Sequence, residues 1–195
     1  MPKSTKDRLL ESGLELLLRH GYNDLGLQSL LQSTGVPKGS FYHHFHSKED
    51  FALQVVDRYM AEVHAGLDAS LGDTALPPLD RVRRFFELTR EKYHGEGYLG
   101  CMLGGLGQEL AGVNDTFQNK IETCFSQMAD RIAACFEEAR EDGTLSPQAE
   151  PRVLAELVLN CWEGAALRSR LRRERSPLDT MLDFYFQAVS PATTP

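Results

Sequence analysis

The stretch from Gly26 to Phe51 constrains the fold of this chain more than any other part of the sequence. It holds two short segments of helical pattern on either side of Gly35, a residue that lets the backbone turn sharply. The second short segment carries Lys, Ser, Tyr and His side chains, and an apolar helical pattern follows it at once. A short polar helix that follows a glycine turn and rests on an apolar scaffold is typical of a helix-turn-helix.

The polar segment has one face for packing and other faces for contact. Phe41 and Phe45 are spaced by one helical turn, so we expect them to anchor the buried face. Gly39 would leave room for close approach to a phosphate backbone. Lys48 begins the next helix, where its charge and the unpaired backbone N–H groups are expected to bind a phosphate. The expected DNA contacts are Gln28, Ser29, Gln32, Pro37, Lys38, Gly39, Ser40, Tyr42, His43, His44 and Lys48.

The rest of the sequence has helical rather than strand periodicity, so the predicted fold class is all-α. Ser47 to Asp50 resembles a capping box that opens a helix. Ser146-Pro147 and Ser176-Pro177 each offer a cap followed by proline at the first helical position. The first predicted helix ends at Gly21, and the second begins near residue 27. The remaining predicted helices cover residues 38–45, 51–71, 79–93, 103–111, 121–143, 153–171 and 178–189.

Charge and cysteine content narrow the function classes. The formal net charge is -7, which argues against a uniformly basic nucleic-acid coat. Residues 1–50 are nevertheless neutral, so a local basic face can form there. No apolar run approaches a membrane span and no secretory signal is evident, so we expect a cytoplasmic protein without a membrane partner. The four cysteines form no Cys-x-x-Cys pair, which predicts reduced thiols and no bound metal.

The segment GVPKGSFYHHFHSKEDF, residues 35–51, resembles the DNA-binding segment of the TetR family of bacterial repressors. The resemblance implies a three-helix DNA-binding domain over 1–50 and a larger ligand-binding and dimerisation domain over 51–195, which helix 51–71 joins to it. It also implies a homodimer that binds a pseudo-palindromic, double-stranded operator and is released by a small-molecule inducer. Gly26 stands where the family usually has a Ser or Thr cap that can touch a phosphate.

The resemblance also implies that the last two helices of each subunit form a four-helix dimer interface. The expected interface residues are Leu154, Leu157, Val158, Cys161, Ala165, Leu178, Met181, Leu182 and Tyr185.

Residues 100–110 and 162–170 are similar to a narrower branch of the family. That branch includes repressors that answer acrylate and repressors of N-ethylmaleimide reductase, which respond to reactive electrophiles. A cysteine at a helix start gains from unpaired backbone N–H groups, which favour the thiolate. A nearby arginine would favour it further or bind an inducer carboxylate. The expected ligand-binding or sensing residues are Cys101, Gln108, Trp162, Glu163, Arg168 and Arg170.

The role of Cys101 is open at this point between a covalent sensor, a pocket wall and a small buried side chain. A catalytic cysteine would need a base within reach, and apart from the distant His94 no histidine in the expected ligand-binding half is an obvious partner for Cys101. We therefore expect no enzyme activity and no cofactor. Cys124 and Cys135 lie on an apolar stripe and are expected in the core.

Overall fold

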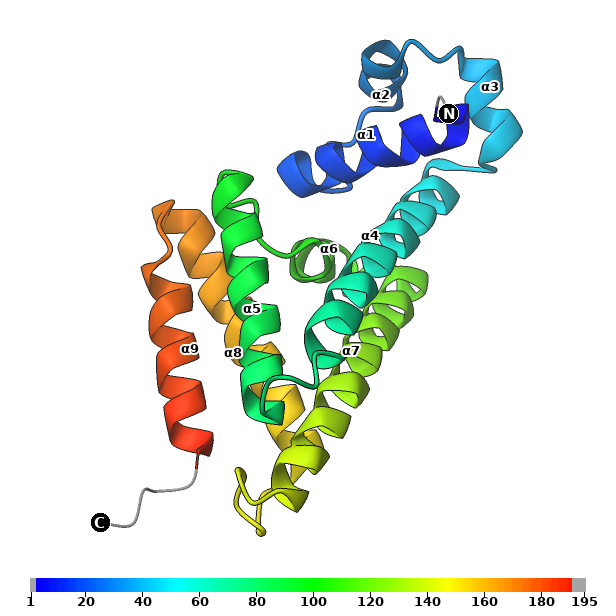
Figure 1. The fold of residues 1–195 in the computed structure, drawn as a ribbon. Helices are drawn as coiled ribbons and strands as arrows, with labels where there is room; N and C mark the ends of the chain where they lie inside the picture. Colours follow the sequence, from blue (N-terminus) through cyan, green and yellow to red (C-terminus); the bar gives the residue numbers. More distant parts are fainter. Residues whose placement is uncertain (1–2, 191–195) are drawn as a thin grey trace. The chain divides into compact units, whose positions relative to one another are not determined.

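The computed structural model describes residues 3–190, over which the chain forms nine helices and no strand (Figure 1). The predicted all-α fold class is therefore confirmed. None of the helices in this described range is long and apolar enough to cross a bilayer. The helices are α1 (Thr5–His20), α2 (Leu27–Thr34), α3 (Lys38–His44), α4 (Lys48–Leu71), α5 (Pro78–Gly95), α6 (Met102–Leu110), α7 (Asp115–Glu141), α8 (Pro151–Arg172) and α9 (Ser176–Val189).

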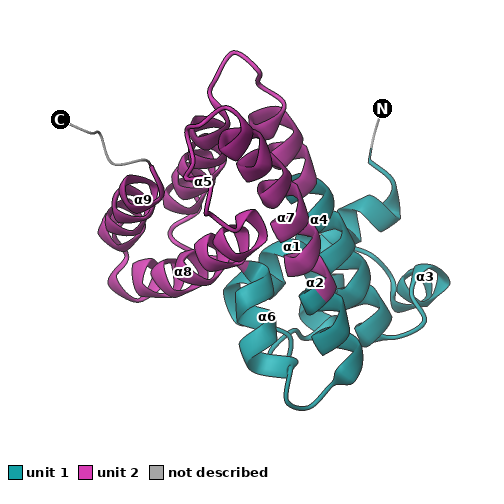
Figure 2. Cartoon of the chain, turned by 90° about the horizontal axis from the view of Figure 1, so that it is seen from below, with its two compact units in different colours: residues 1–63, 102–122 teal, residues 64–101, 123–195 magenta. Residues whose placement is uncertain are grey.

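The helices belong to two compact units that are not continuous in sequence (Figure 2). Unit 1 comprises residues 1–63 and 102–122, and unit 2 comprises residues 64–101 and 123–195. The divisions fall within α4, just before α6 and within α7. The functional boundary expected at residue 50 stays a prediction, because compactness alone does not locate a binding function.

Aromatic packing holds α3 and the start of α4 together in unit 1. The rings of Phe41, Phe45 and Phe51 have centroids 4.9 to 5.3 Å apart, and all three side chains are at most 1% exposed. α1 comes close to this cluster at Gly13, where an added Cβ would lie 2.4 Å from the Phe51 ring. The close approach requires glycine there, since the buried ring has no room to retreat.

Local signals end and begin the helices of unit 1 as the sequence indicates. Gly35 takes φ 65°, the left-handed conformation that ends α2. Ser47 Oγ accepts the Asp50 N–H at 2.9 Å, which confirms Ser47 as the cap, and the Asp50 carboxylate accepts the N–H of His46, one residue before the cap, at 2.8 Å. Gly26 caps α2 without a side-chain hydrogen bond.

In unit 2, α8 and α9 form an antiparallel pair beside α5 (Figure 1). Trp162 of α8 is 3% exposed and packs against Phe86 and Tyr93 of α5, with ring centroids 5.0 and 5.7 Å away. Arg83 and Arg90 of α5 make ion pairs with Asp183 and Asp179 of α9 at 2.7 and 2.6 Å. The apolar contacts bury the inner faces of the helices, the Arg83–Asp183 pair is exposed, and the Arg90–Asp179 pair is half-buried.

Two sequence expectations are wrong in this unit. Ser146-Pro147 starts no helix: it lies in a turn closed by the Ala149 N–H on the Ser146 carbonyl, and α8 begins at Pro151. Five of the nine expected dimer contacts also pack in the protomer's own core, whereas Leu157 is exposed and Leu154, Cys161 and Met181 are half-buried. The buried ones are Val158, Ala165, Leu178, Leu182 and Tyr185.

The outer face of α8 carries four exposed apolar side chains, of which only Leu157 is among the expected dimer contacts. Val153, Leu157, Leu167 and Leu171 are 59%, 46%, 42% and 68% exposed. Their spacing places them along one side of the helix. We call these four side chains the outer stripe of α8.

Candidate functional site

The structure places α3 with its apolar side in the core and its polar side outward. Phe41 and Phe45 are buried, whereas Tyr42 is 49% exposed. The Lys38 ammonium lies 6.0 Å from the centroid of the Tyr42 ring, one turn along the same helix. Of the eleven expected DNA contacts, eight are exposed and three are half-buried, the half-buried ones being Ser40, His44 and Lys48.

The exposed face of α2 continues this polar surface within unit 1. Gln28, Ser29 and Gln32 are exposed, whereas Leu30 is fully buried. A Cβ added at Gly39 would meet nothing within 4 Å, so folding does not require glycine at that position. The two helices thus present uncharged donors and acceptors, one lysine and two histidines to a partner, which is the chemistry that contacts phosphates and base edges.

Lys48 points its ammonium toward the turn between α1 and α2. Its Nζ donates to the Asn23 carbonyl at 3.4 Å and lies 4.5 Å from the centroid of the Tyr22 ring. Both contacts are within unit 1. The turn holds the Lys48 ammonium in place, and the phosphate contact of Lys48 stays a prediction.

The expected sensing residues are only partly brought together. Cys101, directly before α6, donates a hydrogen bond to Glu163 of α8. The stem of Arg170 passes beside Gly100, 3.9 Å from where a Cβ would lie. Trp162 is packed in the core, and Arg168 is exposed. Gln108 is exposed on α6 and belongs to unit 1, whereas the other five belong to unit 2.

Burial raises the pKa of the Glu163 carboxyl to about 7, and the Cys101 hydrogen bond opposes this rise. The carboxyl therefore changes charge near neutral pH. When ionised, it disfavours a second negative charge on the Cys101 sulfur.

The remaining thiols and histidines form no metal centre in the part of the chain that the structure describes. Cys124 and Cys135 are buried at 3% and 1% exposure, as expected for core residues. Burial raises the pKa of the Cys135 thiol to about 11, so this sulfur is protonated and unreactive at neutral pH. Cys161 is half-buried.

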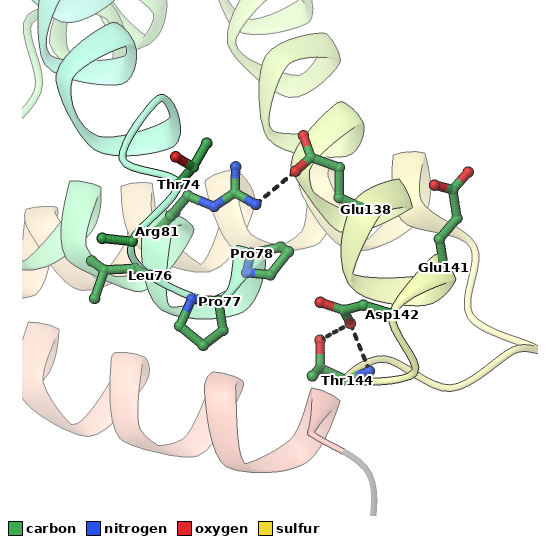
Figure 3. A pocket seen from close by; sticks show the side chains of 10 residues that line it. Thr74, Leu76, Pro77, Pro78, Arg81, Glu138, Glu141, Asp142 and Thr144 are labelled. Carbon is green, nitrogen blue, oxygen red and sulfur yellow. Dashed lines mark hydrogen bonds and ion pairs between the residues drawn. The ribbon is translucent and has the colours of Figure 1, made fainter.

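A cavity of about 690 Å³ opens between the α4–α5 turn, the start of α5 and the end of α7 (Figure 3). Arg81 on its wall is 6% exposed and donates to the Leu71 carbonyl at 2.9 Å and to Glu138 at 2.6 Å. Sequence reasoning missed this arginine because it sits on the buried face of α5, where the pattern predicts only apolar side chains. Arg81 holds the end of α4 to α7 within unit 2.

Comparison with known proteins identifies both parts of the chain. Residues 9–55 match the model for "Bacterial regulatory proteins, tetR family", and residues 78–185 match "Tetracyclin repressor-like, C-terminal domain". The chain is 32% identical over 188 residues to the HTH-type transcriptional repressor DhaR of Mycobacterium sp. strain GP1, covering 96% of this chain and 93% of that protein. It is 37% identical over 171 residues to the transcriptional regulator AcuR of Cereibacter sphaeroides, covering 87% and 78%.

The structural comparison agrees. The crystal structure of the reduced form of Escherichia coli NemR superposes with a TM-score of 0.86 at 28% identity, covering 97% of this chain and all of that one. AcuR and NemR represent the branch that the sequence resembles. The chain therefore belongs to the TetR family of bacterial transcriptional regulators, which bind operator DNA and are not enzymes.

Proposed function

We propose that this regulator is a homodimeric repressor that holds a pseudo-palindromic operator through α2 and α3 and releases it when a small inducer binds. The observation that carries the DNA-binding part of this proposal is α3 itself, whose polar side is exposed while the rings of Phe41 and Phe45 are buried. Residues 1–50 supply the expected DNA contacts, and the larger helical part supplies inducer binding and dimerisation.

The proposed operator binding is tested with a DNA duplex that the protein selects from a pool of random sequences. Lys38→Met should weaken binding to that duplex at least about tenfold, since an exposed lysine lost from a contact surface costs affinity through lost phosphate neutralisation. The melting temperature should not change, because the Lys38 side chain is exposed. Selection of a duplex without two related half-sites would contradict the dimeric arrangement.

The outer stripe of α8 supports dimerisation through α8 and α9. Phe184 of α9, the helix that pairs with α8 in the same protomer, is 74% exposed and adds a large apolar side chain. A run of exposed apolar residues along one helix is typical of a surface that another subunit covers. This surface keeps Leu157 from the expected interface residues and leaves out the five that are buried within the protomer.

The inducer is proposed to be acrylate-like or electrophilic and to act beside Cys101. The thiol, the Glu163 carboxyl and the stem of Arg170 meet in unit 2, which supports this location. A thiol can add to an activated alkene, with its proton passing to the carbon beside the activating group. A carboxylate inducer would instead bind reversibly near the arginine.

Intact-mass measurement beside operator release separates these two modes. N-ethylmaleimide and acrylate are tested on the wild type, on Cys101→Ser, and on Cys161→Ser as a control with a comparably half-buried thiol. Release with one adduct that Cys101→Ser abolishes supports a covalent sensor. Release by acrylate without added mass supports reversible binding. Operator binding that neither compound alters would overturn the inducer proposal.

A further inference from the structure

A carboxylate from α6 holds the turn between α1 and α2, residues 21–26. Glu109 accepts the backbone N–H of Tyr22 on Oε2 at 2.8 Å and that of Asn23 on Oε1 at 2.6 Å. Both carboxylate oxygens are thus used on consecutive residues of the chain. Bonds of this charged kind are stronger than those between neutral groups, and each N–H here would otherwise need another acceptor.

Gly21 makes this contact possible. It has φ +76°, and a Cβ on it would lie 2.6 Å from Glu109 Oε2. A larger residue would be strained in that conformation and would also collide with the carboxylate. The turn and the carboxylate therefore fit one another at close range, although they lie far apart in the sequence.

The same two turn residues support Lys48 at the start of α4. Asn23 gives its carbonyl to the Lys48 ammonium, and Tyr22 gives the face of its ring. The Tyr22 ring is itself held edge-on by Phe117 of α7, with centroids 5.1 Å apart. A chain of direct contacts thus leads from Glu109 through the turn to Lys48, and every member lies in unit 1.

We propose that Glu109 is a positioning residue for DNA binding. Its carboxylate fixes the α1–α2 turn, and the turn fixes the position of the Lys48 ammonium. The inference rests on the proposed phosphate contact of Lys48. Glu109 acts through the turn, because its carboxylate is occupied by the Tyr22 and Asn23 N–H groups. Holding a flexible lysine in place before binding reduces the conformational entropy that binding would otherwise cost.

A double-mutant cycle on DNA affinity tests the proposal. Glu109→Gln keeps the shape of the side chain but offers one acceptor oxygen to two N–H donors. With Lys48 present, we expect the substitution to weaken binding to the selected duplex about tenfold, and in the Lys48→Met background less than about twofold, as for residues coupled through a shared backbone segment. The slope of log affinity against log salt should fall by up to about 0.9 in Glu109→Gln and change no further in the double variant.

Asp57→Asn is the matched control. It removes the ion pair of Asp57 with Lys120, which joins α4 to α7 within unit 1 and does not involve the turn. Its effect on affinity should add to that of Lys48→Met. Amide exchange at Tyr22 and Asn23 should quicken in Glu109→Gln and stay unchanged in Asp57→Asn. If Glu109→Gln does not fold, Glu109→Asp takes its place, since the shorter side chain keeps the charge but cannot reach both N–H groups.

The outcomes separate this inference from the proposed function. Additive effects of the Glu109 and Lys48 substitutions, with wild-type binding intact, overturn the positioning role alone. Failure of the wild type to select any duplex overturns operator binding and the positioning role together. Coupling that is as large for Asp57→Asn as for Glu109→Gln also counts against the proposal, because it would show a general loss of rigidity in unit 1.

Discussion

At Gly39, folding does not require glycine, whereas the proposed DNA contact does. Nothing lies within 4 Å of an added Cβ, so Gly39→Ala should leave the melting temperature unchanged or raise it, with a gain of up to about 1 kcal/mol from helix propensity. Operator affinity should fall, because the methyl group stands where the phosphate backbone is expected. Gel-shift titration and thermal melts check both effects. Gly105→Ala, which also meets open space, is the control, and unchanged affinity in Gly39→Ala would contradict the contact.

Glu163 makes stability depend on pH near neutrality. Its folded pKa of about 7 lies above the ordinary value of 4.5, so between these pH values the folded state holds a proton that the unfolded chain has released. Stability should therefore fall as pH rises from about 4.5 to 7, by about 2 kcal/mol for a carboxyl that retains some solvent contact.

Glu163→Gln should remove this dependence. Chemical unfolding at pH 5 and pH 8 measures the difference, and the variant should gain on the wild type at the higher pH. Glu156→Gln on the exposed side of α8 is the control and should leave the pH dependence unchanged. An equal pH dependence in Glu163→Gln and wild type would show that the carboxyl is ionised throughout.

At the scale of the element, the outer stripe makes α8 a helix with two apolar sides. Leu167→Glu or Leu171→Glu should convert the dimer to a monomer and weaken operator binding. The dimer dissociation constant should rise at least about thirtyfold, since burying an unpaired carboxylate costs more than about 2 kcal/mol. Sedimentation equilibrium measures this constant. Val113→Glu is the control: Val113 is 80% exposed in the α6–α7 turn, so a dimer that also dissociates in this variant would contradict the assignment.

The helices themselves could be predicted from sequence, because periodicity, glycine stops and the capping box at Ser47 are local signals. Which side of α8 packs against its own protomer could not be predicted. Apolar spacing indicates that a helix face is covered, but not whether the same protomer or a second subunit covers it. Val158 and Leu157 are neighbours with opposite surroundings for this reason. Glu109 had no local signal either, because its partners Tyr22 and Asn23 come from a distant part of the chain.

At the scale of the whole molecule, the helix-turn-helix does not form a compact unit with its neighbours in sequence alone. Residues 102–122 belong to unit 1, and they supply Glu109 and Phe117 to the α1–α2 turn. A fragment of residues 1–63 should therefore lack a cooperative thermal transition. The same fragment joined by a flexible linker to residues 102–122 should regain it. Circular dichroism melts check this, and a cooperative transition in the shorter fragment would contradict the stabilising role of α6.

The interleaving of the two units bears on how such repressors can be recombined. The simplest chimera that takes its sensor from one relative and its DNA specificity from another would have one crossover after the DNA-binding helices. Here the chain passes between units near residues 63, 101 and 122, twice within a continuous helix. A functional exchange therefore needs three matched crossovers, and a gene with a single one would pair the α1–α2 turn of one parent with the α6 carboxylate of the other.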